Sequence, residues 1–444
     1  MDNGKFLFGV ATASYQIEGA VAEDGRTPSV WDTFSHTPGV VVEGHTGDVA
    51  CDHYHRYKED VQLIADLGVE YYRFSIAWPR IFPRKGEYNP AGMAFYKNLI
   101  AELKSKGLKP AVTLYHWDLP QWCQDLGGWP NRESIDWFME FADKCFIELG
   151  DSVDMWFTFN EPMCICELGY GNGAHAPGIR DTKQFLQAWH HVALSHGYAI
   201  RRYRELGLTA PIGIVLNPQQ QTPYNPANPD DVRAAQFINE AFNGWYLSPL
   251  FRGCYPESGK RLYRHPADIF DYIQEEDFAV MGEPMDFVGI NYYQEFYVRY
   301  ISEEDGIIRA ETIPADGRKT MLNWNITPDG LENVIRQLRE YTDLPILVAE
   351  NGSAWPDTVA EDGCVHDEYR VEYLRQHLDV VRRANEQGLN VMGYFAWSLM
   401  DNFEWTEGYI PRFGLIYVDY ETQQRIPKDS YYVYRDILTT WEDN

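Results

Sequence analysis

Eight short runs rich in β-branched and aromatic residues alternate with longer amphipathic segments along this chain of 444 residues. Such runs predict strands, and apolar residues three and four positions apart predict helices between them. The strands are expected at residues 6–13, 71–77, 109–116, 155–160, 212–217, 286–292, 346–350 and 391–398. Eight strand–helix units in a chain of this length predict an α/β fold, a (β/α)8 TIM barrel.

Glycine and proline mark the ends of the predicted helices. Thr327 and Pro328 precede apolar residues with helical spacing, as an N-cap and a first-turn proline do. Four glycines follow helical segments and precede predicted strands, the position of a C-terminal cap: Gly68, Gly107, Gly207 and Gly388. No low-complexity or Pro/Ser-rich linker divides the chain, so residues 1–444 are expected to form one catalytic domain.

The charge and the cysteines limit partners and compartment. The formal net charge of −28 argues against nucleic acid and anionic membranes as partners, because like charges repel. No apolar run approaches the length of a membrane span, and residues 1–8 lack the apolar core of a signal peptide. The 7 cysteines form no CxxC pair, so buried free thiols and a cytoplasmic location are expected. Nothing in the sequence specifies an oligomeric state.

Carboxylates, amides and indoles gather where the predicted strands end. In a (β/α)8 barrel the carboxyl ends of the strands form the active-site face, so these side chains should meet at one mouth. In chain order they are Gln16 and Glu18, Arg73, His116 with Trp117 and Asp118, Asn160 and Glu161, Asn291 and Tyr293, Glu350 and Asn351, then Trp397, Glu404 and Trp405. A chance gathering of this many such groups is improbable, because isolated polar residues at barrel ends usually serve only loops and caps.

Two of these carboxylates, Glu161 and Glu350, end the fourth and seventh predicted strands, across the barrel from each other. Taken singly, an ion pair with a neighbouring base explains each glutamate as well as catalysis does. Glycoside hydrolysis needs such a pair, one group to protonate the leaving oxygen and one to attack or to activate water. Together with the indoles and amides, the pair favours a glycosidase. A separation of about 5–5.5 Å would mean retention of configuration, and a wider one inversion.

Motifs along nearly the whole chain resemble those of glycoside hydrolase family one, the β-glucosidase family. They lie at residues 8–19, 72–81, 113–120, 158–162 (TFNEP), 350–352 (ENG) and 397–405. The resemblance implies a (β/α)8 barrel that hydrolyses β-glucosides and oligosaccharides such as cellobiose with retention. No ligand cluster of the right type and spacing for a metal is visible in the sequence, and two carboxylates suffice for the chemistry, so no cofactor and no metal are expected. β-Galactosides and β-fucosides are further expected substrates.

The resemblance also implies roles by position. Glu161 matches the acid/base and Glu350 the nucleophile, while Asn160 matches the residue that binds the sugar 2-hydroxyl. The other substrate-binding positions are Gln16, His116, Trp117, Asn291, Tyr293, Trp324, Trp397, Glu404 and Trp405, with Trp397 as the platform under the sugar and Trp324 beside the aglycone. Arg73, Asn291 and Tyr293 match the shell around the nucleophile. Ala349 replaces a usual Thr, and Asn325 stands where relatives often have Glu.

Physical chemistry agrees with the two main roles. A cation beside a carboxyl lowers its pKa, so Arg73 is expected to keep Glu350 ionised. The charge of Glu350 should in turn raise the pKa of Glu161, which then carries a proton at working pH.

The same residues argue against several different functions. A 6-phospho-β-glycosidase would need a phosphate-binding set where Glu404 and Trp405 stand. A catalytically silent sugar-binding relative would lack one glutamate, and a plant-type thioglucosidase would lack the acid/base. His53 with His55, and His190 with His191, are spaced so that they point apart, which argues against a metal site. The glycine-rich residues 169–173 lack nucleotide-binding spacing and predict a loop over the active site.

Overall fold

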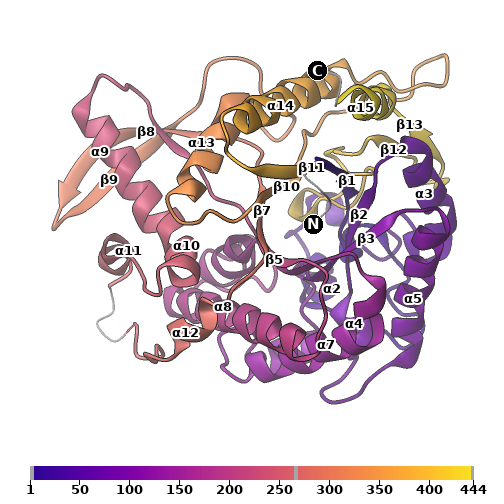
Figure 1. Cartoon of the computed structure of the whole chain (residues 1–444), viewed down its shortest axis with the longest axis horizontal. Helices are drawn as coiled ribbons and strands as arrows, with labels where there is room; N and C mark the ends of the chain where they lie inside the picture. Colours follow the sequence, from indigo (N-terminus) through magenta and orange to yellow (C-terminus); the bar gives the residue numbers. More distant parts are fainter. Residues whose placement is uncertain (1–4, 265–268, 442–444) are drawn as a thin grey trace.

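Eight parallel strands close into a barrel in the computed structural model, which describes residues 5–264 and 269–441 (Figure 1). Around the ring they follow in chain order: β1 (Leu7–Ala11), β2 (Tyr71–Ser75), β3 (Lys109–Tyr115), β4 (Met155–Asn160), β5 (Ile212–Leu216), β7 (Phe287–Asn291), β10 (Ile346–Asn351) and β11 (Val391–Trp397), which pairs with β1. The predicted (β/α)8 barrel is confirmed. Of the segment 1–8 in which no signal peptide is expected, residues 1–4 lie outside the described part.

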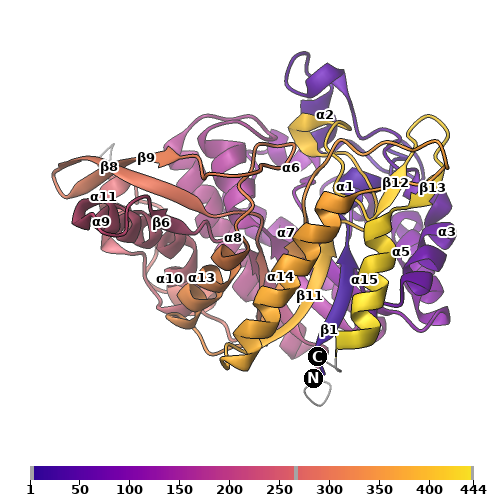
Figure 2. The same cartoon turned by 90° about the horizontal axis from the view of Figure 1, so that it is seen from above.

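Helices surround the ring of strands in both views (Figures 1 and 2). The longer ones are α3 (His53–Leu67), α5 (Pro90–Ser105), α7 (Ser134–Leu149), α8 (Thr182–Glu205), α9 (Pro229–Ile238), α10 (Gly244–Phe251), α13 (Pro328–Arg339), α14 (Glu368–Glu386) and α15 (Asp429–Thr440). The shorter ones are α1 (Ser14–Ile17), α2 (Val30–Ser35), α4 (Trp78–Ile81), α6 (Gln121–Asp125), α11 (Glu257–Leu262) and α12 (Asp277–Met281), with five 3-10 or π segments, η1 (Val42–Gly44), η2 (Gly150–Ser152), η3 (Cys164–Gly171), η4 (Asn239–Asn243) and η5 (Trp405–Glu407).

The predicted helix ends match the backbone. Gly68, Gly107, Gly207 and Gly388 all have positive φ, between 71° and 86°, which is the left-handed conformation of a C-terminal cap. Helix α13 begins at Pro328, as predicted, although the Thr327 side chain accepts from the backbone N–H of Glu295 instead of capping the helix.

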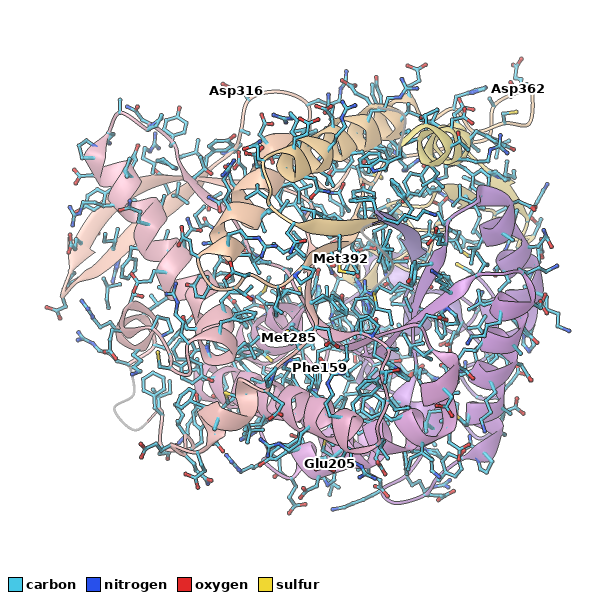
Figure 3. The ribbon with its side chains drawn as sticks, viewed as in Figure 1. Phe159, Glu205, Met285, Asp316, Asp362 and Met392 are labelled. Carbon is cyan, nitrogen blue, oxygen red and sulfur yellow. The ribbon has the colours of Figure 1, made fainter. Side chains whose placement is uncertain are left out.

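The barrel interior is filled by apolar side chains. Every strand of the ring contributes to one buried cluster: Leu7, Tyr71, Ala111, Met155, Phe157, Val215, Phe287, Leu347, Ala349 and Phe395. Met392, labelled near the middle of Figure 3, is the second residue of β11 and packs against this cluster. The Arg73 guanidinium lies 5.0 Å from the centre of the Phe157 ring, so the first polar side chain of the site lies next to this apolar cluster. Ala349 is fully buried in the cluster, where its small side chain is packed.

Two small sheets lie outside the barrel. One contains β6 (Gln221–Pro223), β8 (Phe296–Glu304) and β9 (Ile307–Ile313), which project at one edge of the molecule in Figures 1 and 2. The other pairs β12 (Ile416–Val418) with β13 (Arg425–Pro427). The β8–β9 hairpin occupies the extra length between the sixth and seventh barrel strands.

Some expectations need correction. The glycine-rich residues 169–173 were expected to form a loop, but Gly169, Tyr170 and Gly171 belong to the π-helix η3, and Tyr170 is buried. Five of the cysteines are buried as expected, whereas Cys254 and Cys364 are exposed. Across residues 5–264 and 269–441, no helix has the length and apolarity needed to span a membrane.

Candidate active site

A cavity of about 680 Å³ opens at the carboxyl ends of the barrel strands. Of the residues expected to bind substrate or act on it, those that line the cavity are His116, Trp117, Glu161, Asn291, Tyr293, Trp324, Glu350, Trp397, Glu404 and Trp405. Arg73, Asn160 and Gln16 are buried behind this lining and contact it. The structure therefore brings together all the residues expected to bind substrate or act on it. Glu18, Asp118 and Asn351 were also expected at the mouth but do not line the cavity, because they bind Arg80, Ser14 and the carbonyl of Tyr292.

Glu350 is held from two sides at the end of β10. Arg73 Nη1 donates to its Oε1 at 2.7 Å, and the Tyr293 hydroxyl donates to its Oε2 at 2.8 Å. Burial raises the pKa of Glu350 above its ordinary value, while Arg73 and the two hydrogen bonds act in the opposite direction. The cation was expected to keep this group ionised; its effect has the expected sign, but burial is the larger cause.

Glu161 follows β4 with a left-handed backbone (φ 49°). Asn291 Nδ2 donates to its Oε1 at 2.7 Å, and the Cys164 thiol donates to its Oε2 at 3.0 Å. Burial, and then the charge of Glu350, raise the pKa of Glu161 to about 7. The Asn291 amide lowers the pKa of both glutamates, so both carboxyl groups lie within reach of one side chain.

Among the residues expected to bind substrate or act on it, three polar atoms are buried with no protein partner: Gln16 Oε1, His116 Nδ1 and Asn291 Oδ1. A buried polar group without a hydrogen bond is costly, so such atoms indicate a polar ligand. His116 Nε2 accepts from Asn160 Nδ2 at 3.1 Å, which leaves the proton on Nδ1 as a free donor. Burial, and then Arg73, hold the pKa of His116 well below its usual range, so the ring is neutral.

Aromatic rings form one wall of the cavity. The His116 ring lies nearly parallel to those of Trp397 and Trp405, with centroids 5.9 and 6.1 Å away, and Trp117 packs on Trp405 at 4.4 Å. Trp324 packs beside Tyr293 at 5.3 Å. Flat apolar faces beside free hydrogen-bonding atoms suit a sugar ring, which has apolar faces and a polar rim.

Glu404 is linked to Gln16, whose Nε2 donates to Asn402, to the carbonyl of Phe403 and, at 3.4 Å, to Glu404. Burial, and then Glu350 and Glu161, raise the pKa of Glu404 to about 8. This shift favours the protonated form of Glu404 near pH 7. The described lining contains no Lys or Arg that would neutralise a phosphate.

The structure also shows contacts that the sequence did not reveal. Cys164, which donates to Glu161, and Asn402, which accepts from Gln16, carry no positional signal beyond their closeness in the chain to Glu161 and Glu404. No group of three or more His, Cys, Asp or Glu in the described ranges is arranged to hold a metal ion. His190 binds Asp277, whereas His191 binds the carbonyl of Trp129, so the two rings do diverge.

The two glutamates predict a bell-shaped pH dependence of kcat/KM in the free enzyme. Activity should rise as Glu350 ionises and fall as Glu161 loses its proton, with the alkaline limb at about pH 7. The measurement is kcat/KM for a nitrophenyl glycoside from pH 4 to 10, with a stability check at each end. A rate that still rises through pH 9 would contradict the role of Glu161 as the acid.

A closed (β/α)8 barrel with two buried, close glutamates beneath a sugar-sized aromatic cavity defines a glycoside hydrolase. The chain belongs to glycosyl hydrolase family 1, because that family's model matches residues 3–442. It is 44% identical to "Beta-glucosidase A" of Acetivibrio thermocellus, over 98% of this chain and 97% of the relative. A "Bifunctional beta-D-glucosidase/beta-D-fucosidase" of Bifidobacterium breve is 43% identical over 98% and 97% of the two chains. The crystal structure of the GH1 beta-glucosidase from Exiguobacterium antarcticum B7 superposes with a TM-score of 0.95, at 49% identity, covering 99% of this chain and 98% of that one.

Proposed function

We propose that the protein is a retaining β-glucosidase that removes terminal non-reducing β-D-glucosyl residues by double displacement. Glu350 attacks the anomeric carbon while Glu161 protonates the glycosidic oxygen. Glu161 then takes a proton from water, which displaces Glu350 from the glucosyl ester. The observation that carries this proposal is the contrast between the two carboxyls: Arg73 and Tyr293 both donate to Glu350, while Glu161 is held by Asn291 and Cys164, and burial raises its pKa to about 7.

The other site residues would hold the sugar. Arg73 Nη2 donates to Asn160 Oδ1 at 2.7 Å, which turns the Asn160 amide NH2 toward His116, and the 2-hydroxyl would lie beside this amide. Gln16, His116 and Glu404 would bind the remaining hydroxyls, and Trp397 would lie under the ring. Trp324, beside Tyr293, would contact the aglycone.

The substrate range follows from the same pocket. Cellobiose and short β-glucosides are the proposed substrates, which would give the protein a role in cellulose degradation. β-Fucosides are included because the Bifidobacterium breve relative is named for both activities. We place the activity in the cytoplasm and in one catalytic domain, residues 1–444, because five of the 7 cysteines are buried free thiols and one barrel supplies every site residue.

A panel of nitrophenyl glycosides tests this function against a 6-phospho-β-glycosidase activity. The plain β-glucoside should have a kcat/KM at least about 100-fold higher than its 6-phosphate, because burying a phosphate without a cation costs several kcal/mol. β-Galactoside and β-fucoside extend the panel, and the α-glucoside is the matched control that should not react. A higher kcat/KM for the phosphorylated glucoside would overturn the assignment.

A silent sugar-binding protein and a plant-type thioglucosidase are less well supported by the site. The first lacks one catalytic carboxylate and the second lacks the acid/base, whereas here both Glu161 and Glu350 line the cavity. Sugar binding without any release of nitrophenol across the panel would favour the silent protein.

A further inference from the structure

The two oxygens of Glu161 have partners of different kinds. Asn291 Nδ2 is a donor only, so Oε1, at 2.7 Å, remains an acceptor whether Glu161 is charged or neutral. Oε2 faces the Cys164 thiol at 3.0 Å, and sulfur both donates and accepts weakly. The proton that Glu161 transfers therefore belongs on Oε2, beside the sulfur.

The thiol is itself held in place. Cys164 is the first residue of η3, is 8% exposed and lines the cavity. Asn217, just after β5, donates from Nδ2 to its sulfur at 3.5 Å. Backbone hydrogen bonds also fix the short segment from Glu161 to Cys164. The Glu161 amide donates to the carbonyl of Val215, and the Ile165 amide donates to the carbonyl of Glu161. A chain of hydrogen bonds thus runs from Asn217 through Cys164 to Glu161.

We propose that Cys164, held by Asn217, is a positioning residue that serves Glu161 in both of its states, accepting weakly from the carboxylic acid and donating to the carboxylate. The inference rests on the proposed function, since it assigns a partner to the acid/base. Burial, and then Glu161, raise the pKa of the Cys164 thiol well above its usual range, so the sulfur keeps its proton throughout.

The proton balance is simple. In the first displacement the proton leaves Oε2 for the glycosidic oxygen, and a weak sulfur acceptor does little to retain it. The thiol S–H then turns to Oε2 and stabilises the new carboxylate. In the second displacement water gives its proton to Oε2, and the thiol returns to its first orientation. A hydroxyl in place of the thiol would donate more strongly to the carboxylate and hold the acid proton more tightly.

Other groups also face Glu161 and its sulfur partner. They are Glu350 from β10, Arg73 from β2, Tyr293 after β7, Glu404 after β11 and, beside the sulfur, Glu167 within η3. His116 of the neighbouring strand end is neutral. All of them remain when Cys164 alone is replaced, so a change in the titration of Glu161 reports on the thiol.

The test is the alkaline limb of the kcat/KM profile. Cys164→Ala removes the donor to the carboxylate, which should raise the pKa of Glu161 and move the limb up by about half a unit to one unit. Cys164→Ser should return the limb to the wild-type position or below it, and should slow glycosides with poor leaving groups more than activated ones. Cys166→Ala is the matched control, because Cys166 is buried in the same helix and its pKa is affected by Glu167 rather than Glu161.

A limb that stays in place in Cys164→Ala, or moves equally in Cys164→Ala and Cys164→Ser, would overturn the proposal. A second measurement needs no active variant: the infrared S–H stretch of the wild type should shift to lower frequency as pH rises through the pKa of Glu161. The shifting band should be lost in Cys164→Ser and kept in Cys166→Ala, and a band that does not move would also overturn the proposal. If the wild type hydrolyses no β-glucoside, the proposed function fails, which is a separate result.

Discussion

Glu350→Ala is expected to lower kcat for cellobiose by about five orders of magnitude or more, because no other side chain takes the place of the nucleophile. Truncation should leave a space beside Arg73 and Tyr293, which now hold the carboxylate at 2.7 and 2.8 Å. Azide, a small anion, should enter this space and attack the α face, with Glu161 still supplying the proton. The product should be α-glucosyl azide.

Proton NMR of the anomeric signal measures both the product of this variant and the stereochemistry of the wild type. The wild type should release β-glucose first, since two inversions give net retention. Glu350→Gln is the matched control: it also lacks the nucleophile, but the amide fills the space, so azide should not restore activity. If Glu350→Ala gave β-glucosyl azide, or the wild type released α-glucose first, the roles assigned to the two glutamates would have to be exchanged or the retaining mechanism abandoned.

Glu161→Ala is expected to slow formation of the glucosyl ester by about 10² to 10⁴-fold for cellobiose, whose leaving sugar needs a proton. Dinitrophenolate leaves without protonation, so a dinitrophenyl glucoside should form the ester at close to the wild-type rate. Pre-steady-state release of the phenol measures this step separately from hydrolysis of the ester.

Azide provides a second measurement for the same variant. In Glu161→Ala it should intercept the glucosyl ester on Glu350 from the β face and give β-glucosyl azide, the opposite anomer from Glu350→Ala. If the rate of ester formation fell equally for cellobiose and for the dinitrophenyl glucoside, Glu161 would not be the acid.

The barrel was predictable because its strands are buried on both faces and therefore appear as continuous apolar runs, bounded by glycines such as Gly68 and Gly388. Each observed barrel strand begins and ends within two residues of its expected position. The sheet of β6, β8 and β9 was not expected, because its exposed strands mix charged and apolar residues. The π-helix η3 was missed because its hydrogen-bond register leaves no pattern in the sequence, and Gly169 and Gly171 suggested a loop.

The candidate site was predictable to the extent that topology alone fixes it. Side chains that end parallel strands must meet at one mouth, so Glu161 and Glu350 were placed together without any distance. The contact between Cys164 and Glu161 depends on the turn after β4, where Glu161 has φ 49°, and no spacing rule gives that turn. The titration of Glu350 and Glu404 depends on burial, which exceeds the effect of Arg73 on Glu350.

The charge of Glu350 is the second-largest cause of the raised pKa of Glu161, and this charge does not last through the proposed reaction cycle. When Glu350 becomes a glucosyl ester it is neutral, so its contribution to the pKa of Glu161 disappears while the Asn291 and Cys164 hydrogen bonds remain. The pKa of Glu161 then falls, which favours transfer of its proton to the leaving group. Glu161 is left as the carboxylate that the next half-reaction requires. Release of glucose restores the anion on Glu350 and with it the affinity of Glu161 for a proton. The pKa of Glu161 thus changes twice in each turnover, once in each half-reaction.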